Sequence, residues 1–271
     1  MITDPTADQI NQYRACGFVA IPNMFDATEL EAWRQATDEA IRERLAGSRE
    51  NTNQTIAPGD DYYAQVFLQA LRLADTHAGM RKLMYDPRVG RFAALLAGID
   101  GIRVWHDQAL IKQPYGNPTG WHLDNPYWSF SSPNAISIWI ALDDATLQNG
   151  CLCFIPGSHK TARYDNSGIG PQLNALFKIY PEWMKIDPVA VPAKAGTALF
   201  HNGMTAHGAG ANMTNKPRRA MTCAYMPDGA TFNGSRNILP EELFKKLKVG
   251  DVLDDPHQTP LIWKAPATGA S

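Results

Sequence analysis

The sequence has no long apolar run, no excess of charge of one sign and no cysteine pair of the CxxC type. Its apolar runs are far shorter than the roughly 20 residues that span a bilayer, and no basic-then-apolar signal segment opens the chain. A formal net charge of −2, with Lys and Arg scattered, excludes the basic stripe of a nucleic-acid-binding protein. Four cysteines without such a pair favour free thiols in a reducing compartment, and these absences together predict a cytoplasmic protein.

The sequence does contain enough apolar material for a sizeable core, since 44% of its 271 residues are hydrophobic. It shows no internal repeat and no linker, so we expect one domain over residues 1–271. Residues 1–100 have mostly helical character, whereas residues 101–227 contain a series of strand-like segments. Residues 228–271 are predicted to form a C-terminal tail with a short helix over residues 241–248.

The first part of the chain carries signals for helix starts and stops. Asp26 is a capping residue with Glu29 three positions later, which predicts a helix over the run to Leu45. An Asp-Pro pair that begins at Asp86 predicts a second helix, which stops near Gly98.

Short β-favouring segments dominate after Gly101: "IRVWHDQALIK", "AISIWIAL", "CLCFIP", "TALFH" and "RRAMTCAYMP". Residues 143–150 have the composition of a connection between two antiparallel strands. Several such strands in series predict a sandwich or barrel of the jelly-roll kind. Because the helices precede the strands, an α+β or mainly β fold is favoured over an alternating parallel sheet.

Four stretches lie outside these elements. Residues 48–61 are polar and predict a loop, whereas residues 62–78 return to helical spacing. Residues 160–188 lack steady periodicity, and we expect them to form an excursion near the mouth of the barrel. The Pro-rich tail after Asp254 is expected to be loosely held.

A histidine and an aspartate two residues apart, His122 and Asp124, lie in the aromatic stretch "GWHLDNPYW". In an extended segment such residues project from one face, so both can reach a single ion. Two histidines and one carboxylate on one face of an octahedron suit Fe(II) oxygenases. The second histidine must come from elsewhere, and His207, flanked by small residues, is the strongest candidate. We expect its rival His201 to support the site or the structure.

Two adjacent arginines follow, Arg218 and Arg219, and only one of them can point into a barrel. A buried arginine is best matched by a carboxylate that it binds through two hydrogen bonds. Because the strand offers no nearby acid, a bound carboxylate ligand is the natural partner. His106 and Asp107 are adjacent and so face opposite ways, and we expect a structural role for them.

The motifs "WHLD", "NGCLCFIPGSHK" and "HGAGAN…RR" together resemble the phytanoyl-CoA dioxygenase (PhyH) family. Members of this family are Fe(II)- and 2-oxoglutarate-dependent oxygenases. The resemblance spans roughly residues 8–226 and is sharpest between residues 104 and 222. It implies a double-stranded β-helix core, which is a jelly-roll of the cupin type, with the N-terminal helices packed around it.

The resemblance implies that His122, Asp124 and His207 are the iron ligands and carry the catalysis. It also bears on the subclass, because related halogenases have a small residue where this chain has Asp124. The carboxylate fills the position that chloride takes in those enzymes. The expected enzyme is therefore a hydroxylase and not a halogenase.

For the co-substrate 2-oxoglutarate, the resemblance implies that Arg218 binds the far carboxylate and that Trp139 and Gln108 are further contacts. One departure from the family concerns Ala209, where relatives often carry a serine that helps to hold the carboxylate. Thr222 or a water molecule is a candidate replacement.

The activity implied is hydroxylation of an unactivated C–H bond in a small-molecule metabolite, with O₂ consumed and succinate and CO₂ released. A zinc hydrolase with the same triad and a non-catalytic ligand-binding barrel are the alternatives. The first does not explain Arg218, and the second usually shows a damaged triad. No cluster of Lys and Arg suits the phosphates of coenzyme A, which slightly favours a small or apolar substrate, and the sequence leaves the oligomeric state open.

Overall fold

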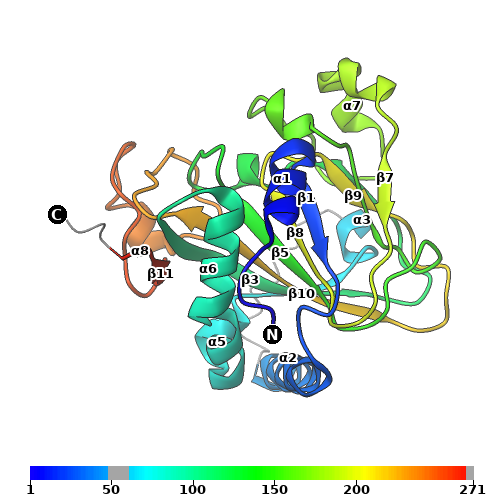
Figure 1. The fold of residues 1–271 in the computed structure, drawn as a ribbon, viewed down its shortest axis with the longest axis horizontal. Helices are drawn as coiled ribbons and strands as arrows, with labels where there is room; N and C mark the ends of the chain where they lie inside the picture. Colours follow the sequence, from blue (N-terminus) through cyan, green and yellow to red (C-terminus); the bar gives the residue numbers. More distant parts are fainter. Residues whose placement is uncertain (48–60, 267–271) are drawn as a thin grey trace.

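The computed structural model describes residues 1–47 and 61–266, so nearly all of the loop expected over residues 48–61 lies outside the described residues. Among the described residues, two antiparallel sheets form a sandwich (Figure 1). The larger sheet runs in the order β1 (Phe18–Ile21), β8 (Ala198–Asn202), β5 (Ile136–Ala141), β10 (Arg218–Pro227), β3 (Gly101–Lys112) and β11 (Leu261–Lys264), with β2 (Leu68–Leu71) also paired to β3. The smaller sheet runs β4 (Thr119–His122), β9 (His207–Ala209), β6 (Leu152–Phe154) and β7 (Val189–Val191). This arrangement confirms the expected mainly β, jelly-roll architecture.

The α-helices are α1 (Ala7–Cys16), α2 (Ala27–Gly47), α3 (Asp61–Ala64), α4 (Leu73–Thr76), α5 (Ala78–Met84), α6 (Pro87–Ala97), α7 (Ala175–Ile179) and α8 (Glu241–Phe244), and short 3₁₀ helices cover Asn125–Tyr127, Ser158–Lys160 and Pro181–Lys185. The start of α2 has the expected capping box, in which the Glu29 amide donates to Asp26 Oδ1 at 2.9 Å. At the start of α6 the Arg88 amide donates to Asp86 Oδ1 at 2.8 Å. The short helix expected over residues 241–248 is present as α8 but ends at Phe244. No helix among the described residues combines the length and hydropathy needed to cross a bilayer.

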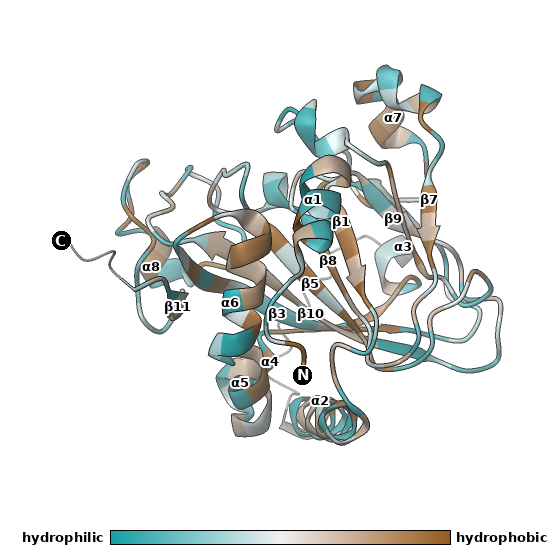
Figure 2. Cartoon of the chain, in the orientation of Figure 1, coloured by the Kyte–Doolittle hydropathy of each residue, from teal (hydrophilic) through white to brown (hydrophobic). Residues whose placement is uncertain are grey.

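Helices α2, α5 and α6 cover one face of the larger sheet (Figure 1). Trp33, Met80 and Phe92 from these helices pack with Ile138 and Phe200 of the sheet in one buried cluster. In Figure 2 the same helices alternate between hydrophilic and hydrophobic colours, as amphipathic helices do. The helices therefore bury this face and leave the other face of the sheet to the smaller sheet and to a cavity.

Alternation along the strands separates these two faces of the larger sheet. On β10, Met221, Cys223 and Tyr225 belong to the core beneath the helices, whereas Arg218 and Thr222 line the cavity. Successive residues of a strand project to opposite faces, so each central strand contributes to both environments.

Residues 62–78 do not form the helix that their spacing predicts. They contain α3, then β2, then α4. The edge of β3 offers hydrogen bonds to this segment, and Leu71 pairs with Gln108 across the two strands. A helix of this length is marginal by itself, so pairing with an existing sheet outweighs its helical spacing. Within the mostly helical first hundred residues, β1 likewise joins the sheet by pairing with β8.

Two other expectations need correction. The tail after Asp254 is not loosely held throughout, because β11 pairs with β3 and the Val104 amide donates to Pro260 O at 3.0 Å. Residues 143–150 do not join two strands that pair with each other. They connect β5 in the larger sheet to β6 in the smaller one, so this segment carries the chain across the sandwich.

Asp107 ties β3 to the helical layer. Its side chain is buried and accepts a hydrogen bond from the Leu73 amide at 2.8 Å and from the Ala74 amide, at the start of α4. Burial raises the pKa of Asp107 to about 6, since desolvation outweighs these hydrogen bonds. The expected structural role of Asp107 is therefore the capping of a helix from a neighbouring strand.

This raised pKa predicts a pH dependence of stability. The folded chain binds more protons at Asp107 than the unfolded chain does between pH 3.8 and about pH 6. The corresponding stabilisation is complete below this window and is lost as the pH rises through it. Relative to Asp107→Asn, the free energy of unfolding of the wild type should fall by about 3 kcal/mol from pH 3.5 to pH 7. Urea unfolding of both proteins across this range measures the difference, and parallel pH profiles would contradict the prediction.

Candidate metal centre and its cavity

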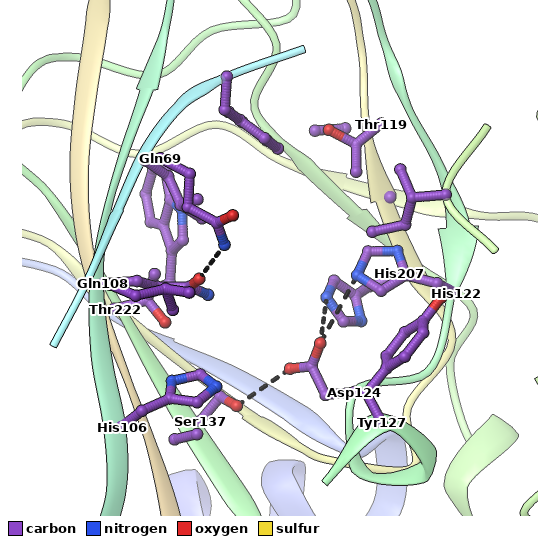
Figure 3. A pocket seen from close by; sticks show the side chains of 18 of the residues that line it. Gln69, His106, Gln108, Thr119, His122, Asp124, Tyr127, Ser137, His207 and Thr222 are labelled. Carbon is purple, nitrogen blue, oxygen red and sulfur yellow. Dashed lines mark hydrogen bonds and ion pairs between the residues drawn. The ribbon is translucent and has the colours of Figure 1, made fainter. Parts of the chain in front are cut away.

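Three side chains meet between the two sheets: His122, Asp124 and His207 (Figure 3). His122 on β4 pairs directly with His207 on β9, which brings the centres of the two rings to 4.2 Å. Asp124 Oδ1 lies 3.5 Å from His122 Nε2 and 3.6 Å from His207 Nε2. All three potential ligand atoms lie within 4.8 Å of one another, so one metal ion can contact all of them.

Asp124 reaches this point by a route that the H-x-D spacing does not predict. Strand β4 ends at His122, and Asp124 has a helical backbone conformation with φ −82° and ψ −51°. A 3₁₀ turn begins after it, and the amides of Asp124 and Asn125 both donate to Gly203 O, at 3.0 and 2.9 Å. The carboxylate therefore approaches the histidines from a turn, and the expectation of two ligands on one strand face is wrong.

The hydrogen bonds of the two histidine rings select which nitrogen faces the site. His122 Nδ1 lies 2.9 Å from Gly120 O, and His207 Nδ1 lies 3.0 Å from Thr205 O. A carbonyl oxygen accepts only, so each Nδ1 carries the proton and each Nε2 presents a lone pair. Burial, with a contribution from His122, lowers the pKa of His207 to about 3, so its ring is neutral. Both rings are thus oriented as metal ligands.

The second oxygen of Asp124 is held by the larger sheet. His201 Nε2 lies 3.0 Å from Asp124 Oδ2, and the Ser137 hydroxyl donates to the same oxygen at 3.1 Å. Burial alone would raise the pKa of Asp124, but His207 and the other imidazoles hold it well below its usual range. The carboxylate is therefore ionised and oriented, with Oδ1 facing the two ligand nitrogens. The structure places His201 in the supporting position expected of it.

The triad opens into a cavity of about 450 Å³ that is mostly apolar. Its lining residues come from both sheets, from α3 and β2, from the excursion over residues 160–188 and from the segment before α8. They are Tyr63, Phe67, Gln69, Leu71, His106, Gln108, Leu110, Thr119, His122, Asp124, Tyr127, Trp128, Ser137, Trp139, Leu152, Gly168, Ile169, His201, His207, Gly208, Ala209, Arg218, Thr222, Ala224, Asn237 and Ile238. A cavity of this size suits a small organic ligand.

Arg218 lines the cavity and Arg219 does not, as alternation predicts. The Arg218 side chain is 1% exposed, and its Nε and Nη1 atoms have no hydrogen-bond partner among the described residues. Its guanidinium carbon lies 5.1 Å from the centre of the Trp139 ring. Burial lowers the pKa of Arg218 to about 10, so the group stays charged at neutral pH. Arg219 instead pairs with Asp143 and Asp38 on the outer face, at 2.8 and 2.7 Å.

The other residues expected to contact a co-substrate lie beside Arg218. Trp139 on β5, Thr222 on β10 and Gln108 on β3 are neighbours across the three strands. Gln108 accepts a hydrogen bond from the side-chain amide of Gln69 on β2 (Figure 3). Ala209 also lines the cavity, where its methyl group offers no hydrogen bond. Thr222, the expected candidate to replace the missing serine, carries a hydroxyl group in this row.

Lys112 supports the wall of the cavity. Its ammonium donates to Asn117 O at 2.7 Å and to Thr119 Oγ1 at 3.4 Å, and it lies 4.7 Å from the centre of the Phe67 ring. Thr119 and Phe67 line the cavity in front of it. Burial, with a contribution from Arg218, lowers the pKa of Lys112 to about 7.

The aromatic residues next to the triad have two different environments. Tyr127 and Trp128 line the cavity, and the Tyr127 hydroxyl donates to Ser167 O at 2.8 Å. Trp121 instead packs against Phe177 of α7, with ring centres 5.6 Å apart. The excursion over residues 160–188 thus encloses the cavity, as its expected position at the mouth indicated.

Several polar lining residues were not predicted from the sequence, among them His106, Ser137 and Gln69. A signal existed for the first two. His106 is two residues before Gln108, and Ser137 is two before Trp139, so each pair shares a strand face. For Gln69 there was no such signal, because its segment was expected to be a helix.

Comparison with known proteins agrees with this geometry. A family model described as phytanoyl-CoA dioxygenase (PhyH) matches residues 13–220. The chain is 27% identical over 232 residues to the methylphosphonate hydroxylase of Gimesia maris, covering 83% of this chain and 82% of that protein. It is similar in structure to the non-haem α-ketoglutarate-dependent carbocyclase SnoK from nogalamycin biosynthesis, with 27% identity, a TM-score of 0.78 and coverage of 95% and 96%. It is also similar to the epimerase SnoN in complex with Fe³⁺, α-ketoglutarate and nogalamycin RO, with 27% identity, a TM-score of 0.74 and coverage of 94% and 97%.

Proposed function

The chain belongs to the phytanoyl-CoA dioxygenase (PhyH) family, and from this premise we propose that it is a non-haem Fe(II)- and 2-oxoglutarate-dependent oxygenase acting on a small molecule. The reaction that we propose is hydroxylation of an unactivated C–H bond. His122, Asp124 and His207 hold the iron in this proposal, and Arg218 binds the co-substrate.

One observation carries the proposal: a buried, charged arginine with unpartnered donors lines the same cavity as the triad. A buried guanidinium that lacks an acceptor is costly, so its position indicates a ligand that brings the acceptor. A carboxylate matches the planar, two-pronged geometry of Arg218. Trp139 lies against the guanidinium and restricts its orientation. A co-substrate with two carboxylates would offer one to Arg218 and the other to the metal.

The donor set fits ferrous iron. Two imidazole nitrogens and one carboxylate oxygen form the 2-His-1-carboxylate set of Fe(II) oxygenases, with the remaining positions open to the cavity. When bound, Fe(II) with 2-oxoglutarate supplies the oxidation of a C–H bond by O₂, coupled to conversion of 2-oxoglutarate to succinate and CO₂.

The chain itself contributes orientation and the exclusion of water. The carbonyl oxygens of Gly120 and Thr205 hold the ligand rings in one tautomer. His201 and Ser137 hold Asp124 Oδ2 and thereby aim Oδ1 at the ion. The mostly apolar lining of the cavity keeps bulk water away from the reacting atoms, which strengthens every polar contact made inside.

Two alternatives explain less of the geometry. A zinc hydrolase would explain the triad, but it would not explain an unpartnered Arg218 in the same cavity. A non-catalytic barrel has no need for a triad in which every member is oriented by hydrogen bonds. Anaerobic addition of Fe(II) and then 2-oxoglutarate separates the oxygenase from these two alternatives. The oxygenase should develop a weak visible charge-transfer band, and the other two should not.

The decisive experiment measures turnover. The Fe(II)-loaded chain, incubated with 2-oxoglutarate and O₂ across a broad substrate panel, should form succinate and a product that is one oxygen atom heavier than its substrate. A product with unchanged mass, or with two hydrogens fewer, would keep the oxygenase and overturn hydroxylation. Absence of both succinate and 2-oxoglutarate binding would overturn the whole proposal.

His201 provides a test of the support around the triad. His201→Phe keeps a ring but removes the hydrogen bond to Asp124 Oδ2, so Fe(II) affinity should fall about 10- to 100-fold. Competition with a chelator measures this affinity. Ser137→Ala is the matched comparison, since it removes the neutral donor to the same oxygen, and its loss should be smaller. Unchanged iron binding in His201→Phe would show that this ring does not orient Asp124.

A further inference from the structure

His106 occupies one end of a row of four residues that crosses the larger sheet. The register places His201 beside Ser137, Ser137 beside Ala224, and Ala224 beside His106. The first two members of this row hold Asp124. The other two line the same cavity, Ala224 one strand spacing (roughly 5 Å) and His106 two spacings (roughly 10 Å) from Ser137. Among the described residues, neither has a hydrogen bond to the triad. This half of the row is therefore a part of the cavity wall that the triad does not use, and Figure 3 shows its end residue His106 beside Ser137.

The side chain of His106 has an unused polar atom. It is 9% exposed, and within the part of the chain that the structure describes its Nδ1 has no hydrogen-bond partner. The Trp128 ring packs edge-on against it, with ring centres 6.3 Å apart and an interplanar angle of 87°. Burial lowers the pKa of His106 to about 4, so at neutral pH the imidazole is uncharged and can both donate and accept a hydrogen bond. An oriented, neutral and unpartnered imidazole in a cavity wall points to recognition of a polar group.

The charge in the cavity lies at Arg218 and at the triad, outside this half of the row. Among the described residues that line the cavity, Arg218 is the only lysine or arginine and Asp124 the only carboxylate. Arg218 is six residues from Ala224 on β10, roughly 20 Å along the strand, and its guanidinium lies over Trp139. In the proposed function both groups are already engaged, Arg218 by the co-substrate and Asp124 by the metal. No other lining side chain among the described residues can neutralise a charged substrate.

The surroundings of His106 are apolar. Ala224, Trp128 and Ile238 belong to one hydrophobic cluster and line the cavity. Ala224 lines the cavity between Ser137 and His106, so a larger side chain at this position would extend into the cavity. Asn237 stands beside this cluster, with its Oδ1 bonded to the Trp105 indole at 3.1 Å. A ligand here meets flat apolar surface and very few polar groups.

We propose that this half of the cavity is the substrate site, that His106 binds the substrate through one hydrogen bond, and that the substrate is an uncharged, mainly apolar, ring-containing molecule with a hydroxyl or carbonyl group. The proposal rests on the proposed function in assigning Arg218 to the co-substrate. The proposed substrate class differs from that of the relative named for methylphosphonate. A phosphonate carries negative charge, and this half of the cavity has no cationic side chain to match it. The carbon that is oxidised lies near the metal, and the group bound by His106 lies at the other side of the same molecule.

Four matched probes test the charge and the hydrogen bond separately: 2-indanol, indane, indane-2-carboxylate and 2-aminoindane in its ammonium form. Their binding to the full chain is measured by titration calorimetry under argon, with Fe(II) and 2-oxoglutarate present and then absent. We expect 2-indanol to bind at least about tenfold more tightly than either charged probe, because each charge would be buried without a partner. Tighter binding of the carboxylate or the ammonium would overturn the neutral class.

Variants then test His106 itself. His106→Phe should weaken 2-indanol binding about tenfold and leave indane binding within about twofold, because only the first probe makes the hydrogen bond. His106→Asn should recover part of the loss, since its amide retains a donor and an acceptor. An equal loss for both probes in His106→Phe would make His106 structural. Should His106→Phe fail to fold, Ala224→Leu, which extends into the cavity, must weaken all probes if they bind there, and unchanged binding overturns the site.

The outcomes for the two proposals are distinguishable. Probe binding that depends on His106, in a chain that forms no succinate with any substrate, would keep this site and overturn the oxygenase. Succinate formation without any effect of His106 on binding would keep the oxygenase and overturn this site.

Discussion

Asp124→Ala should abolish succinate formation, lowering the rate by at least roughly a thousandfold, or about 4 kcal/mol of transition-state stabilisation. Asp124 supplies the only carboxylate in the group of potential ligands found among the described residues. Its loss leaves the two imidazoles without the negative charge that favours a bound cation, and His201 without its acceptor. The measurement is succinate formed per chain at saturating Fe(II), together with the iron retained after gel filtration.

The control for this substitution is Asp8→Ala, which removes an exposed carboxylate from α1 and should leave both quantities unchanged. Asp124→Asn tests the role of the charge alone, because it keeps the shape of the side chain and one oxygen but removes the charge. Retention of more than a tenth of the wild-type rate in Asp124→Ala would show that Asp124 does not hold the metal.

Arg218→Ala should raise the 2-oxoglutarate concentration needed for half-maximal turnover about a hundredfold, while Fe(II) affinity changes by less than about twofold. Removing one partner of a buried, hydrogen-bonded charge pair costs roughly 2–5 kcal/mol, and the guanidinium is buried. A hundredfold change corresponds to about 2.7 kcal/mol, which lies within this range. Iron affinity should be spared because no ligand of the triad bonds to Arg218. Succinate formation against 2-oxoglutarate concentration measures the first quantity, and anaerobic iron titration measures the second.

The neighbouring arginine provides the matched control. Arg219→Ala removes the same charge from the outer face, where it pairs with Asp143 and Asp38, so the affinity for 2-oxoglutarate should not change. Arg218→Lys should recover only part of the loss, because an ammonium is a point charge that cannot bind a carboxylate with a fork of two donors. Equal losses of iron and 2-oxoglutarate binding in Arg218→Ala would indicate that Arg218 is structural.

Features that follow from short sequence patterns, such as alternation along a strand and helix caps, were predicted correctly from the sequence. Alternation along one strand separates Arg218 from Arg219, and the structure follows it. The meeting of His122 with His207 was predicted from the resemblance of their motifs to a family and not from a local rule, and the two pair directly across β4 and β9. The caps at Asp26 and Asp86 predicted where two helices begin.

Pairing between segments that are distant in sequence could not be predicted from such short patterns. The segment of β2 has helical spacing and becomes a strand only because β3 offers an edge, and Gln69 enters the cavity as a result. The same holds for β11 in the C-terminal tail. Asp124 reaches the triad from a turn whose amides bond to Gly203, a contact that spacing within the motif does not contain. The single domain, the cytoplasmic location and the roles of the site residues stay predictions.

The direct pairing of His122 with His207 links the metal to the fold of the entire chain. The two residues are distant in sequence, so the unfolded chain cannot present both rings to an ion without closing a long loop. Iron should therefore bind the native state almost exclusively and raise the melting temperature in proportion to the logarithm of its free concentration. Chelation would then do more than stop turnover: it would leave a chain that opens more often and is cut sooner by proteases.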